Sequence, residues 1–384
     1  MLLNGSPHTL QNSNSKYQTT KFEEKNRILD HDVYEYGVEY TPKNKEDNST
    51  VVHYGRRQLL INEIEFLTLA LKSLVKDFNK SELLQKEIVV IYAGASPGYH
   101  FLVLSEFFPF IKFILYDKKI INFIFGDKQY RKNFTINQTF INKSIAENLK
   151  KEYPEDKFIC LFISDIRRSN KSEEIVEEDM DLQAEIHEIL KPYKSFLKFR
   201  LPYFNNEKKN KKYLDGTLFF LIYGNPSTSE TRLLVDKNAK TRDYDCSRYE
   251  NQMYYFNNFD RTDCFQHDIH ALGIDHCYDC RAHVYILDQY KKIFENVEKM
   301  FFPNNFELSR KTIKELVDYI NKVTNASSTI INFRYNFENQ LYDCVYNFTK
   351  IKFGQIIDKE FLNSLRKRND DDHTLSYRLN RIRI

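Results

Sequence analysis

Long apolar runs and cysteine are scarce in this sequence, and their scarcity excludes several classes of protein. No stretch approaches the ~18 consecutive apolar residues that a membrane-spanning helix requires, so we expect no membrane as a partner. The first residues, MLLNGSPHTL, lack the apolar core of a secretory signal. Six cysteines in 384 residues are too few for a disulfide scaffold. These absences together predict an intracellular protein with reduced cysteines.

A strong excess of one charge is also missing. The chain has 57 Lys and Arg residues against 54 Asp and Glu residues, which gives a formal net charge of +3. This balance argues against a basic coat that binds nucleic acid over the whole surface, although a local basic groove is compatible with it. The length allows a sizeable core in one or two domains, and no internal repeat is found.

What is present divides into a polar beginning and an alternating centre. Residues 1–50 are rich in Asn, Lys, Ser and Thr and predict a flexible lead-in with little core. A helix with an apolar stripe begins at Leu59. Strand-like runs follow at Ile88–Tyr92, Lys112–Tyr116, Phe158–Ser164, Ser195–Phe199 and Thr217–Tyr223, and helix-compatible stretches include Tyr99–Phe108, Glu178–Leu190 and residues 308–323. This alternation predicts an α/β fold with a doubly wound, mostly parallel sheet and flanking helices on both faces.

A glycine-containing turn, Ala93–Gly98, directly follows the first strand-like run. Its small residues let backbone approach a ligand closely. The turn lacks the Lys-Ser/Thr of a phosphate-binding loop and is not a clean dinucleotide fingerprint, so an ordinary tight βα turn is an equal alternative. The next run ends on Asp117, about 20 residues past the glycines, where such folds bind ribose hydroxyls. An ordinary strand-end residue is the alternative for Asp117, but the two features together favour a ligand that contains adenosine.

Charged residues stand in or beside three later segments. Asp165 follows the third strand-like run, and Lys198 lies within the apolar fourth run. Ligands of doubly wound folds sit beyond the carboxyl ends of the strands, so we expect both residues near the glycine turn. A desolvated lysine in a cleft can act as a base, whereas a lysine that points to solvent is the more common alternative. Glu230 could complete a carboxylate–lysine cluster, or it is an acid in the first turn of a helix.

Several motifs occur together in the order and rough spacing of one family. They are Tyr54-Gly55 with the helix Leu59–Leu71, VVIYAGASPGYH at 89–100, LYDKK at 115–119, FISDIRRS at 162–169, LKFRLPYF at 197–204, ETRLL at 230–234 and RYENQMYYFN at 248–257. With these motifs the chain resembles the poxvirus cap-specific mRNA 2′-O-methyltransferase family, whose members are also the small stimulatory subunit of the poxvirus poly(A) polymerase. The resemblance covers roughly residues 50–300, and similar proteins occur in other large DNA viruses.

The resemblance implies a Rossmann-like S-adenosylmethionine-dependent methyltransferase domain over residues 51–325 and a C-terminal extension over 326–384. The implied reaction is methylation of the ribose 2′-hydroxyl of the first transcribed nucleotide of capped viral mRNA. The implied partners are capped mRNA and a poly(A) polymerase catalytic subunit, in the virion or the host-cell cytoplasm. Two alternatives stay open. One is a catalytically weakened paralogue that acts as an RNA-binding processivity subunit of the polymerase, and the other is a methyltransferase for another position of RNA.

The resemblance also implies roles for individual residues. Asp165, Lys198 and Glu230 fall on three of the four catalytic positions, with Lys198 as the base and the two acids orienting it. The implied cofactor-binding residues are Gly94, Ala95, Pro97, Gly98 and Asp117, with Phe140 and Ile141 against the adenine. Tyr203 and Glu250 fall where the methylated guanine of the cap is stacked and hydrogen-bonded.

The sequence departs from the family pattern at some of these positions. The fourth catalytic position, a lysine in the family, is Gln58, which cannot supply a positive charge. Arg57 supplies one only if the start of the helix is shifted by one residue. In the implied cap pocket, Asn205 replaces an acid and Ser227 replaces an aromatic residue.

Cysteine and histidine residues crowd into one stretch outside these motifs. Cys277 and Cys280 have the spacing of half a zinc site, and His283 follows them. Because a second pair of the usual form is missing, we predict no metal, with a zinc site at these three residues as the alternative.

Overall fold

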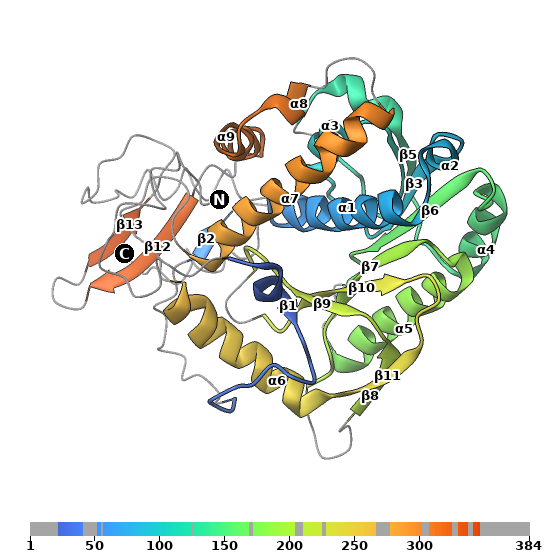
Figure 1. The fold of residues 1–384 in the computed structure, drawn as a ribbon. Coiled ribbons are helices and arrows are strands. Elements are labelled where there is room, and N and C mark those ends of the chain that lie inside the picture. Colours follow the sequence, from blue (N-terminus) through green and yellow to red (C-terminus); the bar gives the residue numbers. More distant parts are fainter. Residues whose placement is uncertain are drawn as a thin grey trace.

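The computed structural model describes residues 22–40, 52–54, 57–123, 126–168, 172–203, 210–224, 228–265, 277–301, 307–324, 329–336 and 341–345. The central sheet is built from β1 (Ile28–Leu29), β3 (Glu87–Ala93), β4 (Ile111–Tyr116), β5 (Phe134–Asn137), β6 (Phe158–Ser164), β7 (Lys194–Phe199), β9 (Thr217–Phe220) and β10 (Thr231–Asp236). Its eight strands lie side by side in the order β1-β9-β10-β7-β6-β3-β4-β5 (Figure 1).

Five neighbouring strands of this sheet are parallel, from β5 at one edge through β4, β3 and β6 to β7. The other three strands, β10, β9 and β1, each run antiparallel to the strand before them in the sheet. Every residue of β3 after Glu87 is buried, as expected for a parallel strand covered on both faces. The predicted α/β architecture with a mostly parallel sheet is confirmed.

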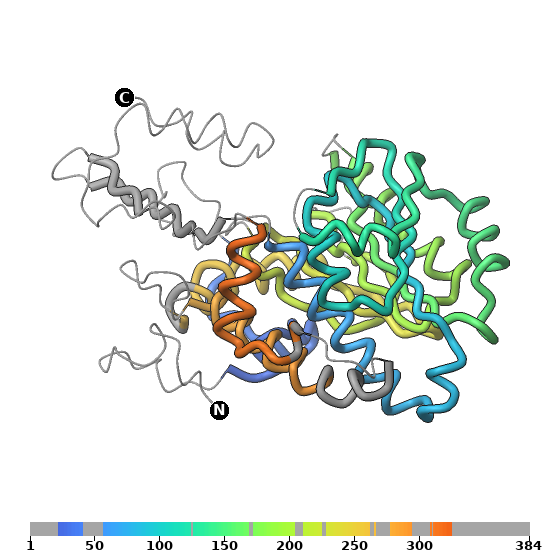
Figure 2. Tube along the Cα trace, turned by 90° about the horizontal axis from the view of Figure 1, so that it is seen from above, coloured from blue at the N-terminus to red at the C-terminus, as the bar shows by residue number. Residues whose placement is uncertain are grey.

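Helices cover both faces of the sheet. α1 (Arg57–Asp77), α3 (Phe101–Phe107) and α7 (Tyr278–Phe301) lie on one side, and α4 (Lys143–Glu152) and α5 (Glu173–Leu190) lie on the other (Figure 1). α1 is buried along most of its length because it lies between the sheet and α7. The view from above shows the last helices, in orange, on the side of α1 away from the green elements (Figure 2).

Shorter elements complete the described residues. The remaining helices are η1 (Glu24–Arg27), α2 (Lys80–Leu84), η2 (Lys128–Asn133), α6 (Cys246–Tyr255), η3 (Phe256–Cys264), α8 (Glu307–Arg310) and α9 (Ile313–Val323). Outside the central sheet, β8 (Asn210–Leu214) pairs with β11 (Thr241–Asp245), and β12 (Thr329–Asn336) pairs with both β2 (Val52–Tyr54) and β13 (Leu341–Val345). None of the helices in the described part of the chain is long and apolar enough to cross a membrane.

The strand predictions hold at the centre of the sheet and fail toward one edge. The first four runs coincide with β3, β4, β6 and β7, but the fifth run ends as a strand at Phe220. The alternative of a helix beginning at Glu230 is wrong, because the following residues form β10, which is paired on both sides. The predicted helix over residues 308–323 is interrupted, since Thr312 caps a separate helix, α9.

The predicted boundary at residue 50 needs correction. Residues 1–21 and 41–50 lie outside the described residues, but residues 22–40 belong to the fold. β1 extends the central sheet by pairing with β9, Leu29 is buried, and Arg27 is fully buried. The polar composition did not indicate that this segment belongs to the fold, because hydrogen bonds and an ion pair help to attach it. Of the predicted extension over 326–384, the described residues are those of β12 and β13.

Arg27 is the centre of that fastening. Its Nε and Nη2 atoms each lie 2.8 Å from a carboxylate oxygen of Glu65 in α1, which makes a bidentate ion pair. Nη1 donates to the hydroxyl of Tyr278 in α7 at 2.5 Å, and Nη2 donates to the carbonyl oxygen of Phe220 at 2.7 Å. One side chain of η1 thus joins α1, α7 and β9.

We expect the substitution Glu65→Ala to lower the free energy of unfolding by roughly 3–5 kcal/mol, because it leaves the buried Arg27 without its counter-charge. Urea denaturation measures this loss. Glu87→Ala is the matched control, since it removes the exposed partner of Lys112 and should cost at most about 1 kcal/mol. Equal losses for the two variants would contradict the anchoring role of Arg27.

Candidate active site

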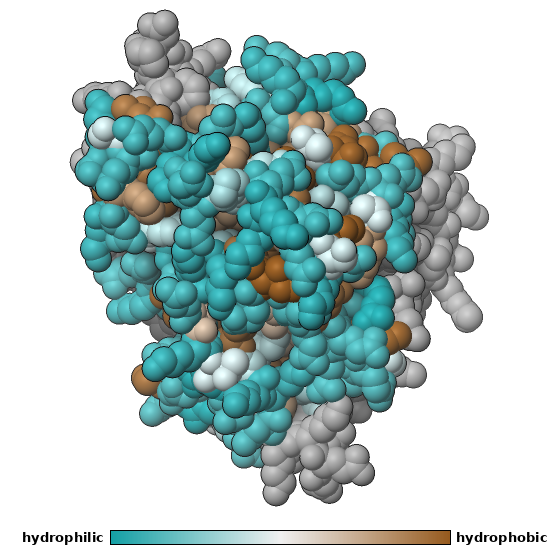
Figure 3. All heavy atoms as spheres, turned by 90° about the vertical axis from the view of Figure 1, so that its right-hand side faces the viewer, coloured by the Kyte–Doolittle hydropathy of each residue, from teal (hydrophilic) through white to brown (hydrophobic). Residues whose placement is uncertain are grey.

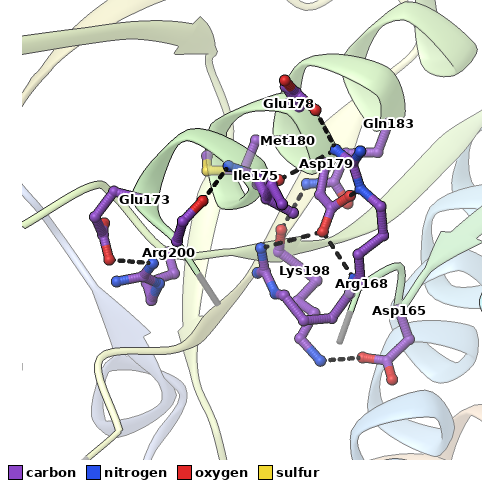
Figure 4. Close-up of polar contacts among 12 residues, drawn as sticks. Asp165, Arg168, Glu173, Ile175, Glu178, Asp179, Met180, Gln183, Lys198 and Arg200 are labelled. Carbon is purple, nitrogen blue, oxygen red and sulfur yellow. Dashed lines mark hydrogen bonds and ion pairs between the residues drawn. The ribbon is translucent and has the colours of Figure 1, made fainter. Parts of the chain in front are cut away.

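Four charged side chains form a closed cluster at one edge of the sheet. Lys198 Nζ lies 3.0 Å from Asp165 Oδ1 and 3.3 Å from Glu230 Oε2. Arg232 Nη2 lies 2.7 Å from the same Asp165 oxygen and 3.0 Å from Glu230 Oε1. Figure 4 shows the side chain of Lys198 reaching toward Asp165. Each cation of the cluster therefore contacts both carboxylates.

The sheet explains why these residues meet. β6 and β7 are parallel neighbours, so Asp165, directly after β6, and Lys198, near the end of β7, lie at the same edge. β10 runs antiparallel beside β7 and begins at this edge, one residue after Glu230. Arg232 is paired directly with Lys198 across the two strands, which places both side chains on one face. Glu230, two residues before Arg232, shares that face.

The cluster is largely closed to solvent, with Arg232 at 3% side-chain exposure and Asp165 at 16%. Burial by itself raises the pKa of Asp165, but the positive charges of Lys198 and Arg232 outweigh it and hold the pKa at about 2. Burial by itself lowers the pKa of Arg232, and the charges of Asp165 and Glu230 more than offset that effect, so the pKa is raised. Asp165 is therefore ionised at neutral pH and Arg232 is charged.

Side chains of α5 hold the backbone on either side of the cluster. Gln183 Nε2 donates to the carbonyl oxygen of Lys198 at 2.6 Å. Arg168, three residues after Asp165, donates from its backbone N and its Nε to the carboxylate of Asp179 at 3.0 and 2.7 Å. Figure 4 draws these contacts, with Asp179 and Gln183 above Lys198 and Asp165 in the view. The loop after β6 and the end of β7 are thereby fixed to the same helix.

Arg232 is the member of the cluster that sequence analysis missed. Its signal is the two-residue spacing from Glu230, which puts two side chains on one face only if the segment is a strand. From sequence, the segment could be a helix or a strand, so this spacing did not indicate which side chains share a face. The pairing of β10 with β7 shows that the segment is a strand.

The two candidates for the fourth catalytic position lie at the start of α1. Gln58 is half-buried, and its uncharged side chain adds no charge to the site. Arg57 is buried and engaged elsewhere, since its guanidinium lies 4.0 Å from the ring centroid of Tyr223 and its Nη1 donates to Asn321 Oδ1 at 2.6 Å. The second positive charge of the cluster is therefore that of Arg232.

The glycine turn lies directly beside the cluster. Gly94 has φ +82°, and a Cβ there would come within 2.8 Å of the carbonyl carbon and oxygen of Asp165. Gly98 has φ +68°, and a Cβ there would lie 2.6 Å from Ile121 Cγ2. Both positions require glycine, because any side chain would have to displace backbone or a packed methyl group. Ala95 is buried in the same turn, and the exposed Pro97 follows a cis peptide bond.

Asp117 closes the other side of this turn. Its Oδ2 accepts a hydrogen bond from the backbone N of Ser96 at 3.0 Å, and its Oδ1 accepts one from the backbone N of Lys119 at 2.8 Å. The structure thus brings the predicted glycine-turn residues and Asp117 together at the carboxyl ends of β3 and β4. Of the two predicted adenine contacts, Ile141 is buried and Phe140 is half-buried, with Lys118 Nζ 5.4 Å from its ring centroid.

A buried hydrogen-bonded set supports the turn from α1. Glu63 accepts a hydrogen bond from the Tyr92 hydroxyl at 2.7 Å, and its other oxygen lies 2.8 Å from His100 Nε2. Tyr92 belongs to the end of β3, and His100 caps α3. All three side chains are buried. The helix that begins beside Gln58 is therefore fastened to both elements that flank the turn.

Tyr203, the predicted stacking residue for the cap, follows β7 and is 48% exposed. The guanidinium of Arg200 lies 4.7 Å from its ring centroid, and Arg200 Nη2 lies 2.9 Å from Glu173. The ring is thus backed by a fixed cation on one side. Asn205 lies outside the described residues.

Glu250, the predicted acid of the cap pocket, lies in α6 and is half-buried. Its neighbour Tyr249 attaches α6 to the start of β10, because the Tyr249 hydroxyl lies 3.1 Å from Thr231 Oγ1 and also donates to the carbonyl oxygen of Ser229. Glu250 is therefore carried by a helix that is bonded to both sides of Glu230. Ser227 lies outside the described residues.

Cys277, Cys280 and His283 are buried at the start of α7. The backbone N of Cys280 donates to Cys277 Sγ at 3.4 Å, and His283 Nδ1 lies 2.9 Å from the hydroxyl of Tyr223. Within the residues that the structure describes, no group of three or more His, Cys, Asp or Glu side chains is arranged to hold a metal ion. The preceding histidines, His267, His270 and His276, lie outside those residues.

The parallel strands, the antiparallel β10 and β9, and the glycine turn beside a charged cluster define a doubly wound, Rossmann-like α/β fold. The family described as poly A polymerase regulatory subunit matches residues 28–307 of this chain, and the chain belongs to that family. The resemblance carried by the motifs is confirmed. The match begins at the first residue of β1, in agreement with the corrected boundary.

Individual relatives were compared as well. The chain is 28% identical over 238 residues to the cap-specific mRNA (nucleoside-2′-O-)-methyltransferase of fowlpox virus (strain NVSL). The matched region covers 57% of this chain and 71% of the relative. Among solved structures, a match is bluetongue virus VP4, described as a multifunctional RNA-capping production line. The identity there is 13% and the TM-score 0.39, and the match covers 58% of this chain and 34% of VP4. The chain thus spans about a third of VP4.

The lowered pKa of Asp165 makes a prediction for acid unfolding. The pKa of the Asp165 carboxyl is lowered from its ordinary value of 3.8 to about 2 in the folded state. Its ionised form therefore stabilises the fold fully above about pH 4. This stabilisation, about 2 kcal/mol, is lost as the pH falls from about 4 to about 2. Urea denaturation across this range should therefore show a steeper loss for the unsubstituted protein than for Asp165→Asn.

The exposed Asp156 provides the control for this comparison, because Asp156→Asn makes the same change in net charge. We expect the Asp156→Asn variant to keep the steep acid dependence. An unchanged acid dependence in Asp165→Asn would show that the cluster does not hold Asp165 ionised.

Proposed function

We propose that this chain transfers a methyl group from S-adenosylmethionine to the ribose 2′-hydroxyl of the first transcribed nucleotide of capped mRNA. The observation that carries the proposal is Lys198, which is held between Asp165 and Glu230 beside a glycine turn at the carboxyl edge of the sheet. The fowlpox virus relative, whose name states a cap-specific 2′-O-methylation of mRNA nucleosides, supports it.

Lys198 is the residue placed to act on the nucleophile. Transfer of a methyl group to a hydroxyl requires that the hydroxyl lose its proton as the new O–C bond forms. In its neutral amine form, Lys198 Nζ receives that proton and then passes it to water. Asp165 and Glu230 fix the direction of the amine, and Arg232 offsets one of their two negative charges. S-adenosylmethionine, when bound, supplies an electrophilic methyl group.

The residues of the turn fit this cofactor. Gly94 and Gly98 let the backbone approach a ligand, since neither position has room for a Cβ. Each oxygen of Asp117 accepts one backbone hydrogen bond, which leaves acceptor capacity for ribose hydroxyls. Phe140 and Ile141 would supply the apolar surface for the adenine ring.

Tyr203 and Glu250 are the residues that would bind the cap. A methylated guanine carries a positive charge, and an exposed aromatic face such as that of Tyr203 attracts a cationic ring by stacking. The carboxylate of Glu250 would accept the N–H groups at the edge of that base.

We expect Lys198→Ala to slow methyl transfer by roughly 10²–10⁴-fold, because it removes the proton acceptor. The assay follows tritiated methyl transfer from S-adenosylmethionine to a short RNA with an N7-methylated cap, and the same RNA already 2′-O-methylated should remain unlabelled. Binding of S-adenosylmethionine, measured by calorimetry, should be retained.

Lys194→Ala is the matched control, since Lys194 lies at the other end of the same strand and pairs with Asp236. We expect it to keep nearly full activity. Retained activity in Lys198→Ala would overturn the role of Lys198, and label in the RNA that is already methylated, or in uncapped RNA, would assign the reaction to another position.

A separate prediction tests the cofactor site. Asp117→Asn keeps the shape of the side chain but removes its charge, so we expect about 10-fold to 100-fold weaker binding of S-adenosylmethionine by calorimetry. Asp243→Asn, on the exposed part of β11, should bind as the unsubstituted protein does. Unchanged affinity in Asp117→Asn would mean that this carboxylate does not contact the ribose.

A second candidate function is that of an RNA-binding processivity subunit of a poly(A) polymerase. The family description and the uncharged Gln58 at a family lysine position favour it. Intact cofactor binding without turnover on capped RNA, together with copurification with a polymerase catalytic subunit, would support this function over methyl transfer.

A further inference from the structure

A pocket opens at the amino ends of the parallel strands, on the opposite side of the sheet's length from the charged cluster at their carboxyl ends. It lies at the amino ends of β6 and β7, between the end of α1, the end of α4 and the end of α5. Its volume is about 420 Å³, within the range of small-molecule sites. Figure 3 shows the side of the molecule that carries α2 and α4, where small hydrophobic areas are set among hydrophilic side chains. Nothing in the proposed methyl transfer uses this pocket.

Two pairs of aromatic rings line the pocket. Phe78 and Tyr193 contact edge to face with centroids 5.9 Å apart, and Tyr153 and Phe158 do so at 5.2 Å. All four rings are half-buried, so each keeps surface that faces the pocket or solvent. The Tyr193 hydroxyl donates to Asp77 Oδ2 at 2.7 Å, which fixes that ring. The pairs come from different elements and offer flat apolar surface to a planar ligand.

Lysines surround these rings. Lys86, Lys150, Lys191 and Lys237 line the pocket, against a single acid, Glu155. Glu155 contacts only two of them, since its carboxylate lies 2.5 Å from Lys237 Nζ and its carbonyl oxygen accepts from Lys86. Lys191 also pairs with a carboxylate, that of Glu188. Lys86 and Lys150 are then the pocket lysines for which the described residues show no carboxylate partner, so the lining carries a modest excess of positive charge.

We propose that this pocket binds a nucleotide of single-stranded RNA, with the base against the aromatic rings and the flanking phosphates on the lysines. The combination of aromatic surface and positive charge is what single-strand binding sites use, and stacking contributes about 1–3 kcal/mol per base. RNA held here approaches the protein at the sheet edge opposite Lys198, so the site does not depend on methyl transfer.

The test measures fluorescence anisotropy of a labelled, uncapped single-stranded RNA octamer with the full chain over a range of salt concentrations. We expect the double variant Lys150→Glu, Lys191→Glu to bind at least 10-fold more weakly and with a shallower salt dependence, because phosphate contacts are lost. Lys143→Glu, Lys322→Glu makes the same charge change at exposed positions outside the pocket and should bind within about twofold of the unsubstituted protein.

A second variant separates RNA from other acidic partners. Tyr153→Leu keeps the lysines and removes one stacking surface, so we expect weaker RNA binding with an unchanged salt dependence. A poly-glutamate peptide should respond to the lysine variant but not to Tyr153→Leu. RNA affinity that survives the lysine substitutions, or that falls equally in the control, would overturn the proposal.

Discussion

β10 pairs antiparallel with β7, and the candidate active site depends on that pairing. The register puts Arg232 directly opposite Lys198, two like charges that would repel each other without compensation. Asp165, delivered by the neighbouring strand, and Glu230, two residues upstream, each contact both cations. The strand that closes the parallel part of the sheet is thus also the one that completes the site.

The cluster also bears on Gln58, the uncharged residue that the resemblance puts at a catalytic lysine position. Gln58 adds no charge, and Arg57 is committed to Tyr223 and Asn321. The site nevertheless has two cations for its two carboxylates, because Arg232 is buried within it. The positive charges of Lys198 and Arg232 favour the ionised form of Asp165, and they lower the pKa of that carboxyl to about 2.

The two edges of the sheet carry different kinds of surface. The carboxyl edge has the glycine turn, Asp117 and the charged cluster, all fixed by hydrogen bonds to strands or to α5. The amino edge has half-buried aromatic rings and lysines around an open pocket. The carboxyl ends of the strands therefore suit a specific reaction, and the amino ends suit the binding of single-stranded RNA. The two proposed sites share no residue.

The sequence by itself determined the central parallel strands, the glycine turn with Asp117, and the presence of Asp165 and Lys198 at strand ends. These features are local, because a continuous apolar run or a small-residue turn leaves its mark on adjacent residues. The sequence also indicated the family, because its motifs occur in the family's order. The match of the family over residues 28–307 confirms this assignment.

Only the tertiary structure decided the rest. The contribution of Arg232 required knowing which strand lies beside β7, and the anchoring of residues 22–40 required the contact of Arg27 with Glu65, 38 positions away. The pocket at the amino ends of the strands takes its aromatic rings from separate segments of the chain. Such features arise from contacts between residues distant in sequence, and spacing along the chain does not encode which of them will meet.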